Sequence, residues 1–286
     1  MMKQSWLCMS FLMTVLLGVV LYSGTVFAGE GKAADMKTDS KNEALKSVVE
    51  KSIGKGVNIL RIEDPEKSPI NGLKQIRVWI EAAYGETPIL YYETEDGKMY
   101  VAGSIFDVEG NNLTSMAVGR PKPRFIAESE MQLNDDYRIG QGNAKIRAVL
   151  WLGTDPLSKR IFETFYKIYE ESKNSIAIYI KFYPRSERDF LKMSMMTCLK
   201  GDKAIDIYKL LLDTVPGWGS DEDLEVFKNK HVSKDAVCNK ALIGNDIELS
   251  KKLKLPLNPV VLINGTMLLE ELNKANISRL SGVELK

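Results

Sequence analysis

The sequence predicts a two-part α+β protein, and three local patterns carry that prediction. Two β-rich runs between residues 88 and 103 flank an Asp-Gly pair, which is a strong hairpin signal because a type I′ turn needs positive φ at both central residues. Residues 146–182 alternate an apolar run, an amphipathic stretch and a second apolar run, typical of a strand–helix–strand unit. Residues 257–268 form two short strands around an Asn-Gly pair.

The first 28 residues are expected to be a cleaved secretion signal. A single basic residue, Lys3, precedes a nearly uninterrupted apolar run from Trp6 to Tyr22, and a small-residue stretch follows, ending at Ala28. Signal peptidase recognises this order of charge, apolar core and small residues. A permanent membrane anchor stays open as the alternative, because the run approaches the roughly 18 apolar residues that can span a bilayer.

The mature chain would carry no net charge. The precursor has 39 Lys and Arg against 38 Asp and Glu, so removing Lys3 with the signal leaves 38 of each. Nucleic acid is therefore not an expected partner, because the basic excess that neutralises phosphates is missing. No stable membrane insertion is expected after signal cleavage. Removing 28 of 286 residues leaves 258, a length that favours two domains.

The N-terminal part is expected to comprise a flexible leader and a small α+β domain. Residues 29–43 have almost no apolar content and cannot drive burial. Residues 44–52 place apolar side chains at helical spacing before Gly54 ends the pattern. A strand at 75–81 and the Asp-Gly hairpin follow, so the domain spans 44–112.

Residues 113–143 are expected to form a partly helical linker, because glycine and proline interrupt every long period there. The second domain is predicted over 144–286 and contains a mostly helical insertion at about 186–253. Its first strand leads into a helix with a well-marked start. Asp155 is a favoured N-cap residue and Pro156 is a favoured first helical residue.

Few side chains suit other chemistry. The chain has one histidine, His231, so it offers few residues from which a zinc site or a Ser-His-Asp triad could be built. We therefore expect no metal and no cofactor. Cys8 would leave with the signal, so the mature chain keeps Cys198 and Cys238. In an exported protein such a pair is expected to form a disulfide rather than two free thiols.

The order of elements resembles that of the bacterial periplasmic disulfide isomerases of the DsbC and DsbG family, over nearly the whole mature chain. The string from Gly103 to Gly110 is similar to part of the family's N-terminal domain, and the string from Asn258 to Thr266 is similar to its cis-proline loop and following hairpin. The resemblance implies a thioredoxin-like fold with a helical insertion, preceded by a small cystatin-like α+β domain and a helical linker. It also implies a periplasmic homodimer.

The chain departs from the family in the active site. Where the family has two cysteines spaced CxxC at a helix start, this chain has Asp155, Pro156, Leu157 and Ser158. Disulfide exchange needs a thiolate and a second, resolving thiol, so these degenerate positions imply no catalytic residue and a redox-inactive protein. Asp155 is interpreted as a helix cap, and a retained binding role for the site is the alternative.

Two further features follow from the resemblance. Cys198 and Cys238 match the family's structural disulfide in the helical insertion, and a bond closing about forty residues stabilises a fold by about 4 kcal/mol in the chain-entropy estimate. A redox-active role for this pair is the alternative. The bond between Asn258 and Pro259 is expected to be cis, in a loop that faces the helix start and offers its backbone to bound peptides.

The leading hypothesis is an exported, redox-inactive relative of the thiol:disulfide interchange proteins that binds unfolded protein chains as a chaperone-like homodimer in the periplasm. A first alternative is a structural or adaptor component of an envelope or secretion assembly. A second alternative is a thiol:disulfide oxidoreductase that uses Cys198 and Cys238. Holding a chain needs apolar surface but no thiol, which is why the loss of the CxxC pair favours the first of the three.

Overall fold

The computed structural model describes residues 37–214, 221–257 and 259–285. These divide into two compact units: the first comprises 37–57, 62–78 and 90–118, and the second comprises 58–61, 79–89 and the remainder from Gly119 onward. The predicted signal peptide and residues 29–36 of the predicted leader lie outside the described residues. None of the described helices has an apolar stretch long enough to cross a bilayer.

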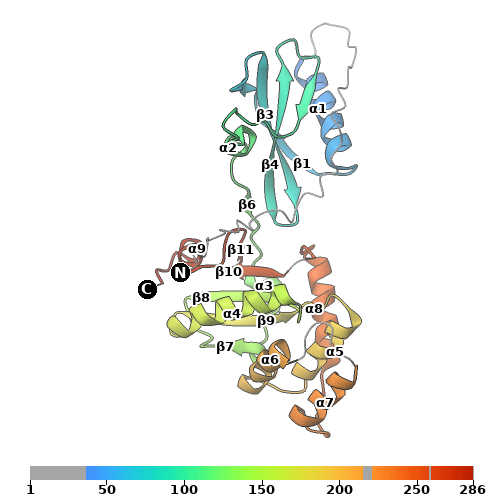
Figure 1. Cartoon of the computed structure of the whole chain (residues 1–286), viewed down its shortest axis with the longest axis vertical. Coiled ribbons are helices and arrows are strands. Elements are labelled where there is room, and N and C mark those ends of the chain that lie inside the picture. The colour runs from blue at the N-terminus through green and yellow to red at the C-terminus, as the bar shows by residue number, and fades with distance from the viewer. Residues whose placement is uncertain (1–36, 215–220, 258, 286) are drawn as a thin grey trace, which may run out of the picture. The chain divides into compact units, whose positions relative to one another are not determined.

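A six-stranded sheet dominates the N-terminal part (Figure 1). Its main path runs β1-β3-β4-β5, with β2 paired to β3 and β6 paired to β4. Helix α1 packs on this sheet through its buried Leu45 and Val49, and the hydroxyls of Ser52 and Tyr91 lie 2.7 Å apart. The elements are α1 (Lys37–Ile53), β1 (Ile59–Ile62), β2 (Glu66–Lys67), β3 (Leu73–Ala82), β4 (Gly85–Thr94), β5 (Tyr100–Ala102), α2 (Leu113–Val118) and β6 (Lys122–Pro123).

The predicted hairpin is present, but its turn differs from the expected type. Strands β4 and β5 pair with Glu93 opposite Tyr100. Gly97 has a φ of 70°, whereas Asp96 is not among the described residues with positive φ. The Asp96 carboxylate accepts hydrogen bonds from the Thr94 hydroxyl and the Lys98 N–H. This side chain closes the turn, so the aspartate itself needs no left-handed backbone.

The second unit contains a five-stranded sheet in the order β11-β10-β8-β9-β7. Strands β8 and β9 are parallel and joined by helix α4, while β10, β11 and β7 pair antiparallel to their neighbours. This strand order, with its βαβ unit and closing hairpin, is the thioredoxin fold. The strands are β7 (Arg138–Ile139), β8 (Ile146–Leu152), β9 (Ile176–Phe182), β10 (Val260–Ile263) and β11 (Thr266–Met267).

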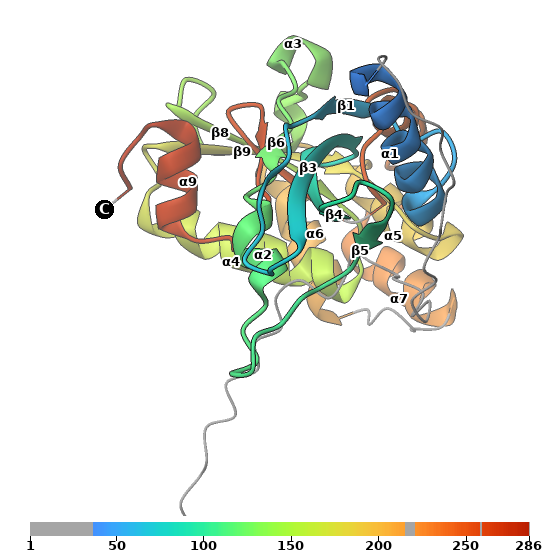
Figure 2. The same cartoon turned by 90° about the horizontal axis from the view of Figure 1, so that it is seen from above.

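Helices cover both faces of this sheet, as the two views of Figures 1 and 2 show. The insertion between β9 and β10 contains four of them, α5 to α8. The helical elements are α3 (Glu128–Met131), the 3-10 turn η1 (Asp135–Tyr137), α4 (Pro156–Glu171), α5 (Glu187–Met196), α6 (Asp202–Thr214), α7 (Asp221–His231), α8 (Lys240–Lys252) and α9 (Lys274–Ser281).

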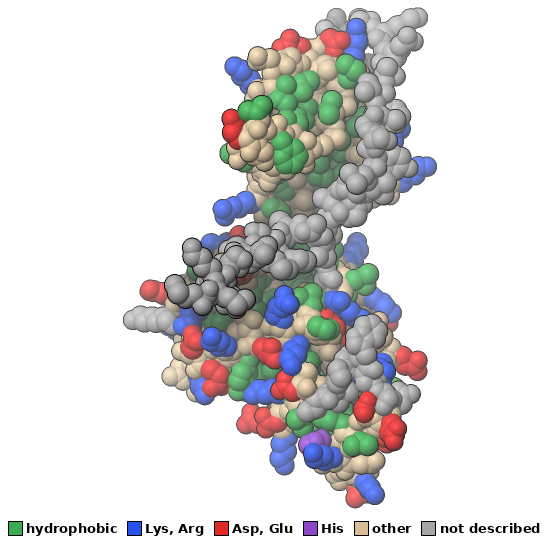
Figure 3. Space-filling model, viewed as in Figure 1, with side chains coloured by type: hydrophobic (Ala, Val, Ile, Leu, Met, Phe, Trp, Pro, Cys, Tyr) green, Lys and Arg blue, Asp and Glu red, His purple; other side chains and the backbone are tan. Residues whose placement is uncertain are grey.

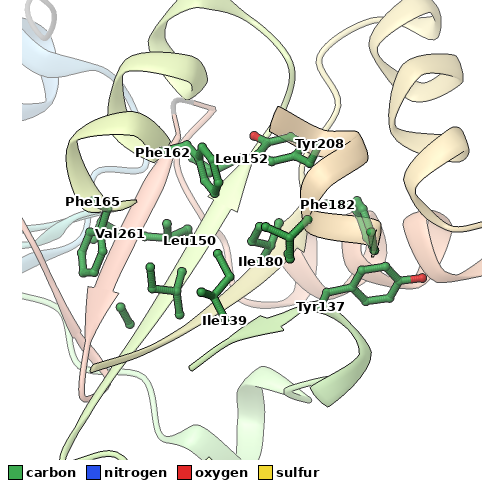
Figure 4. Close-up of a cluster of buried hydrophobic side chains, with 14 of the residues drawn as sticks. Tyr137, Ile139, Leu150, Leu152, Phe162, Phe165, Ile180, Phe182, Tyr208 and Val261 are labelled. Carbon is green, nitrogen blue, oxygen red and sulfur yellow. The ribbon is translucent and has the colours of Figure 1, made fainter. Parts of the chain in front are cut away.

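Alternate residues of the central strands face two separate hydrophobic clusters. Leu150 and Leu152 of β8 point toward Phe162 of α4 and Tyr208 of α6 (Figure 4). Val149 and Trp151 belong to a second cluster on the opposite face, with α8 residues such as Leu249. Strands β8 and β9 are buried on both faces, as expected for central strands of a sheet covered on both sides.

Element boundaries differ from the predicted ones in two places. Helix α1 begins at Lys37, inside the predicted leader 29–43, because no glycine or proline interrupts the helix-compatible residues that follow. The predicted linker 113–143 contains short elements, among them β7, which pairs with β9 in the thioredoxin sheet. A strand of two residues is too short to show the alternation from which strands are predicted.

Candidate functional site at the start of helix α4

Helix α4 begins at the four residues, 155–158, that are predicted to stand where related proteins have a CxxC pair. Asp155 has extended backbone dihedrals, φ −74° and ψ 163°, and Pro156 is the first helical residue. The Asp155 carboxylate accepts hydrogen bonds from the N–H groups of Leu157, at 3.0 Å, and Ser158, at 3.2 Å. The predicted N-cap and first-turn proline are thus confirmed. Asp155 satisfies two of the N–H groups that every helix start leaves without an intrahelical partner.

Ser158 is enclosed in the protein, whereas the positions before it reach the surface. Its side chain is fully buried. The hydroxyl donates to the second Asp155 oxygen at 2.6 Å and accepts the Gly153 N–H at 3.0 Å. Leu157 is 42% exposed, so the surface at the helix start presents a carboxylate and an apolar side chain. No histidine takes part in these contacts, and the serine is held as a structural hydroxyl.

A buried carboxylate from the helical insertion supports this turn. One oxygen of Asp189, on α5, accepts the Thr154 N–H at 2.6 Å and also the Thr154 hydroxyl. Its other oxygen accepts the Arg185 N–H at 3.0 Å. Sequence reasoning missed Asp189, because the local pattern that begins at Ser186 indicates only a helix start: the Ser186 hydroxyl accepts the Asp189 N–H.

Tyr208 of α6 holds the same turn from another direction. Its hydroxyl donates to the Gly153 carbonyl at 2.7 Å, and the side chain is fully buried. Burial, and then the nearby carboxylates of Asp189 and Asp155, raise the pKa of this phenol well above its ordinary value. The phenol therefore stays protonated and keeps its donor role over the pH range in which proteins are handled.

Glycine is required at position 153 for reasons of space. A Cβ there would lie 2.4 Å from the Asp189 Oδ2 and 3.1 Å from the Tyr183 carbonyl oxygen. The first distance is far shorter than any ordinary van der Waals contact. Gly153 thus allows the Asp189 carboxylate to approach the backbone between β8 and α4.

The loop before β10 adjoins this site through the sheet register. Val260, the first residue of β10, pairs with Trp151 near the end of β8, so Pro259, which precedes β10, lies at the edge of the sheet where β8 leads into α4. Leu257 is 84% exposed, and the Tyr183 hydroxyl donates to the Pro256 carbonyl at 3.0 Å. Asn258 lies outside the described residues, as therefore does the peptide bond between Asn258 and Pro259 that is predicted to be cis.

The two cysteines among the described residues are joined to each other. Cys198 and Cys238 form a disulfide that spans 40 residues of sequence. Cys198 follows the C-terminal end of α5, and Cys238 lies two residues before α8. Neither belongs to the α4 start, so the structure brings together Asp155, Ser158, Asp189 and Tyr208 but adds no thiol to them. Within the described ranges, no three His, Cys, Asp or Glu side chains are grouped as metal ligands.

Comparison with known proteins finds similarity in both parts of the chain. Residues 32–115 match the family described as disulfide bond isomerase protein N-terminal domain. This match confirms the resemblance that the sequence shows in its N-terminal part. No curated protein matches the chain.

Several solved structures are similar to about half of this chain. A periplasmic thioredoxin-like protein from Salmonella enterica serovar Typhimurium is 13% identical, with a TM-score of 0.47 over 56% of this chain and 99% of its own. The catalytic domain of Proteus mirabilis ScsC is 18% identical, with a TM-score of 0.46 over 54% and 92%. Wolbachia pipientis α-DsbA1 is 19% identical, with a TM-score of 0.44 over 53% and 94%. At these identities the likeness concerns the fold.

Proposed function

We propose that this chain is an exported, redox-inactive relative of the thiol:disulfide interchange proteins that holds unfolded protein chains as a homodimer in the periplasm. The observation that carries the proposal is the start of α4. A thioredoxin fold follows an isomerase-type N-terminal domain, yet Asp155 and Ser158 occupy the places of the two thiols and bond to each other. The scaffold is kept and the exchange chemistry is not.

The positions of Cys198 and Cys238 support a redox-inactive protein. A reactive cysteine needs an environment that stabilises its thiolate, such as a helix N-terminus. That environment exists at Asp155, where no sulfur is present. Cys198 instead follows the C-terminal end of α5, where the helix dipole disfavours an anion. Cys238 is bonded to it.

Exposed apolar side chains support the binding of protein chains. In the first unit four of them lie within residues 101–116, from β5 to α2, and Figure 3 shows green side chains on one face of that unit. Single exposed apolar residues are ordinary, but a group of them marks an interaction surface. The group comprises Val101, Phe106, Val108 and Met116, at 45%, 58%, 98% and 77% exposure.

Dimer formation through the N-terminal domain is supported by the same region. Strand β5 is the last strand of its sheet path, and an edge strand leaves backbone groups available for pairing with another chain. In the loop that follows, the Asp107 carboxylate accepts hydrogen bonds from the N–H and the side-chain amide of Asn111 at 2.7 and 2.8 Å. Val108 stands at its tip almost fully exposed.

The periplasmic location is supported by two independent observations. The first 28 residues have the pattern of a cleaved export signal. One solved protein that is similar to part of this chain is described as a periplasmic thioredoxin-like protein. Cell fractionation together with mass spectrometry of the mature N-terminus tests the location, and a protein found whole in the membrane fraction would contradict it.

Light scattering of an aggregating, cysteine-free client protein tests the holding function. A client without cysteines separates holding from thiol chemistry. We expect the mature protein to suppress scattering at near-stoichiometric ratios and to show no turnover in an insulin-reduction assay. Unchanged scattering would contradict the proposal and favour the adaptor role. Insulin reduction that disappears in the C198A/C238A variant would favour the oxidoreductase alternative.

A further inference from the structure

The helical insertion has a small hydrophobic cluster of its own, which we call the insertion cluster. It is separate from the two clusters that cover the thioredoxin sheet. Its buried side chains come from α5, α6, α7 and the residue after α7. They are Met195, Ile207, Leu211, Leu224, Phe227 and Val232.

Helix α6 lies between the insertion cluster and the core of the sheet. Its residues Ile205 and Tyr208 belong to the main core, while Ile207 and Leu211 belong to the insertion cluster. The side of α6 that packs on the sheet does not depend on α7. Helix α6 would therefore keep its place if α7 moved away.

Helix α7 buries fewer apolar side chains than α6 does. Among its described side chains, Leu224 and Phe227 are buried, whereas Val226 is 62% exposed and the charged residues point outward. Two apolar side chains three positions apart form a narrow stripe. Burying one such side chain contributes about 1.5–3 kcal/mol, so the buried apolar side chains of helix α7, together with Val232 just after it, stabilise its packing on α5 and α6 by only a few kcal/mol.

The disulfide adds a covalent connection. Cys198 is half-buried and packs against the insertion cluster, and Cys238 ends the segment that follows α7. The bond therefore ties the end of residues 221–238, which we call the α7 segment, to the end of α5. Beside it, the Asn239 N–H donates to the Thr197 carbonyl at 3.3 Å.

We infer that the Cys198–Cys238 disulfide is a redox-controlled closure of the insertion cluster, and that its reduction releases the α7 segment and uncovers an apolar binding surface on α5 and α6. The reductant is an external dithiol. One of its thiolates attacks a protein sulfur and forms a mixed disulfide, and its second thiol then displaces the cysteine. The dithiol becomes a disulfide, and the chain gains two electrons and two protons as two thiols.

The exposed surface has a defined partner chemistry. In the closed state it accepts Leu224 and Phe227 of the chain's own α7, and Val232 just after that helix. In the open state it would accept a segment of an unfolded protein that carries large apolar side chains three positions apart. Met195 lies in this surface, and methionine adapts to partners of different shape. This part of the inference rests on the proposed holding function, whereas the opening itself does not.

Hydrogen exchange of the mature protein, oxidised or reduced with dithiothreitol, tests the opening. At short labelling times we expect the α7 segment to exchange about tenfold faster or more after reduction, as a locally unfolded region does. Strands β8 and β9 should stay protected in both states. The C198A/C238A variant should behave as the reduced protein does and should not respond to dithiothreitol.

A matched pair of variants tests the anchor without touching the cysteines. Phe227→Ser should raise exchange in the α7 segment of the oxidised protein, because it removes a buried anchor. Val226→Ser, on the exposed side of the same helix, should not. An α7 segment equally protected in the oxidised and reduced proteins would overturn the inference, as would loss of protection in β8 and β9 together with it.

Light scattering of the cysteine-free client separates this inference from the proposed function. Stronger suppression of aggregation by the reduced form supports an apolar surface under α7. If the α7 segment opens but neither form suppresses aggregation, the holding function fails and the redox-controlled opening stands. If both forms suppress aggregation equally and exchange is unchanged, the opening fails and the holding function stands.

Discussion

A redox-active thiol needs a cysteine in an environment that stabilises its thiolate. The start of α4 has such an environment without a cysteine, whereas the Cys198–Cys238 disulfide has cysteines without that environment. The α4 start offers a helix N-terminus that would stabilise a thiolate, but it carries the Asp155 carboxylate and the Ser158 hydroxyl. The helical insertion contains the two cysteines, Cys198 and Cys238, but they are bonded to each other, and Cys198 follows the C-terminus of α5. The environment of a cysteine, and not its presence in the chain, therefore decides its chemistry.

The largest expected effect comes from placing two thiols at the α4 start. The double variant Asp155→Cys, Ser158→Cys should change the protein from no turnover to measurable insulin reduction, because the first thiol would lie where the helix dipole lowers a thiol pKa. Ser158→Cys alone places one thiol in a buried position and should stay inactive. A double variant that folds but shows no turnover would mean that the scaffold has lost more than its sulfur atoms.

Removing the disulfide should have the next largest effect. In the chain-entropy estimate, the C198A/C238A variant loses about 4 kcal/mol of the free energy of unfolding, less any strain in the native bond. Denaturant unfolding followed by circular dichroism measures the loss. Wild-type protein in dithiothreitol is the control and should unfold at the same midpoint as the variant. A variant as stable as the oxidised wild type would show that the bond does not constrain the fold.

A pair of glycine substitutions tests whether the turn before α4 leaves room for a side chain at position 153. Gly153→Ala should lower the free energy of unfolding by about 1–3 kcal/mol, because the new methyl group would press on the Asp189 carboxylate. Gly244 lies inside α8 with no atom within 4 Å of a built Cβ, so Gly244→Ala should stabilise the protein by up to about 1 kcal/mol. Thermal unfolding of both variants checks the contrast, and equal shifts would refute the packing argument.

The smallest expected effect concerns the helix cap. Asp155→Ala should cost about 1 kcal/mol of unfolding free energy, because it leaves the Leu157 and Ser158 N–H groups without their acceptor. Asp155→Asn keeps a capping oxygen and should cost less. Denaturant unfolding of the two variants distinguishes a cap from a residue without a structural role, for which alanine and asparagine would both be neutral.

The features that the sequence predicted correctly depend on contacts between near neighbours. The cap at Asp155 bonds to residues two and three positions ahead, and the strands of the βαβ unit show in runs of seven apolar-rich residues. A dipeptide that predicts a β-turn does not by itself decide which turn type forms. At Asp96 a side-chain oxygen closes the turn, whereas at Asn264 and Gly265 both residues have positive φ, and both dipeptides look alike in a sequence.

The sequence alone determined that Asp155 and Ser158 stand at the start of α4, because residue identity and short-range bonding decide the helix cap. Only the tertiary structure brought Asp189 to Thr154 and Tyr208 to Gly153, across 35 and 55 residues of chain. No local period records such contacts. They form because packing α5 and α6 on the sheet buries a carboxylate and a phenol, and buried polar groups must find hydrogen-bond partners wherever the fold places them.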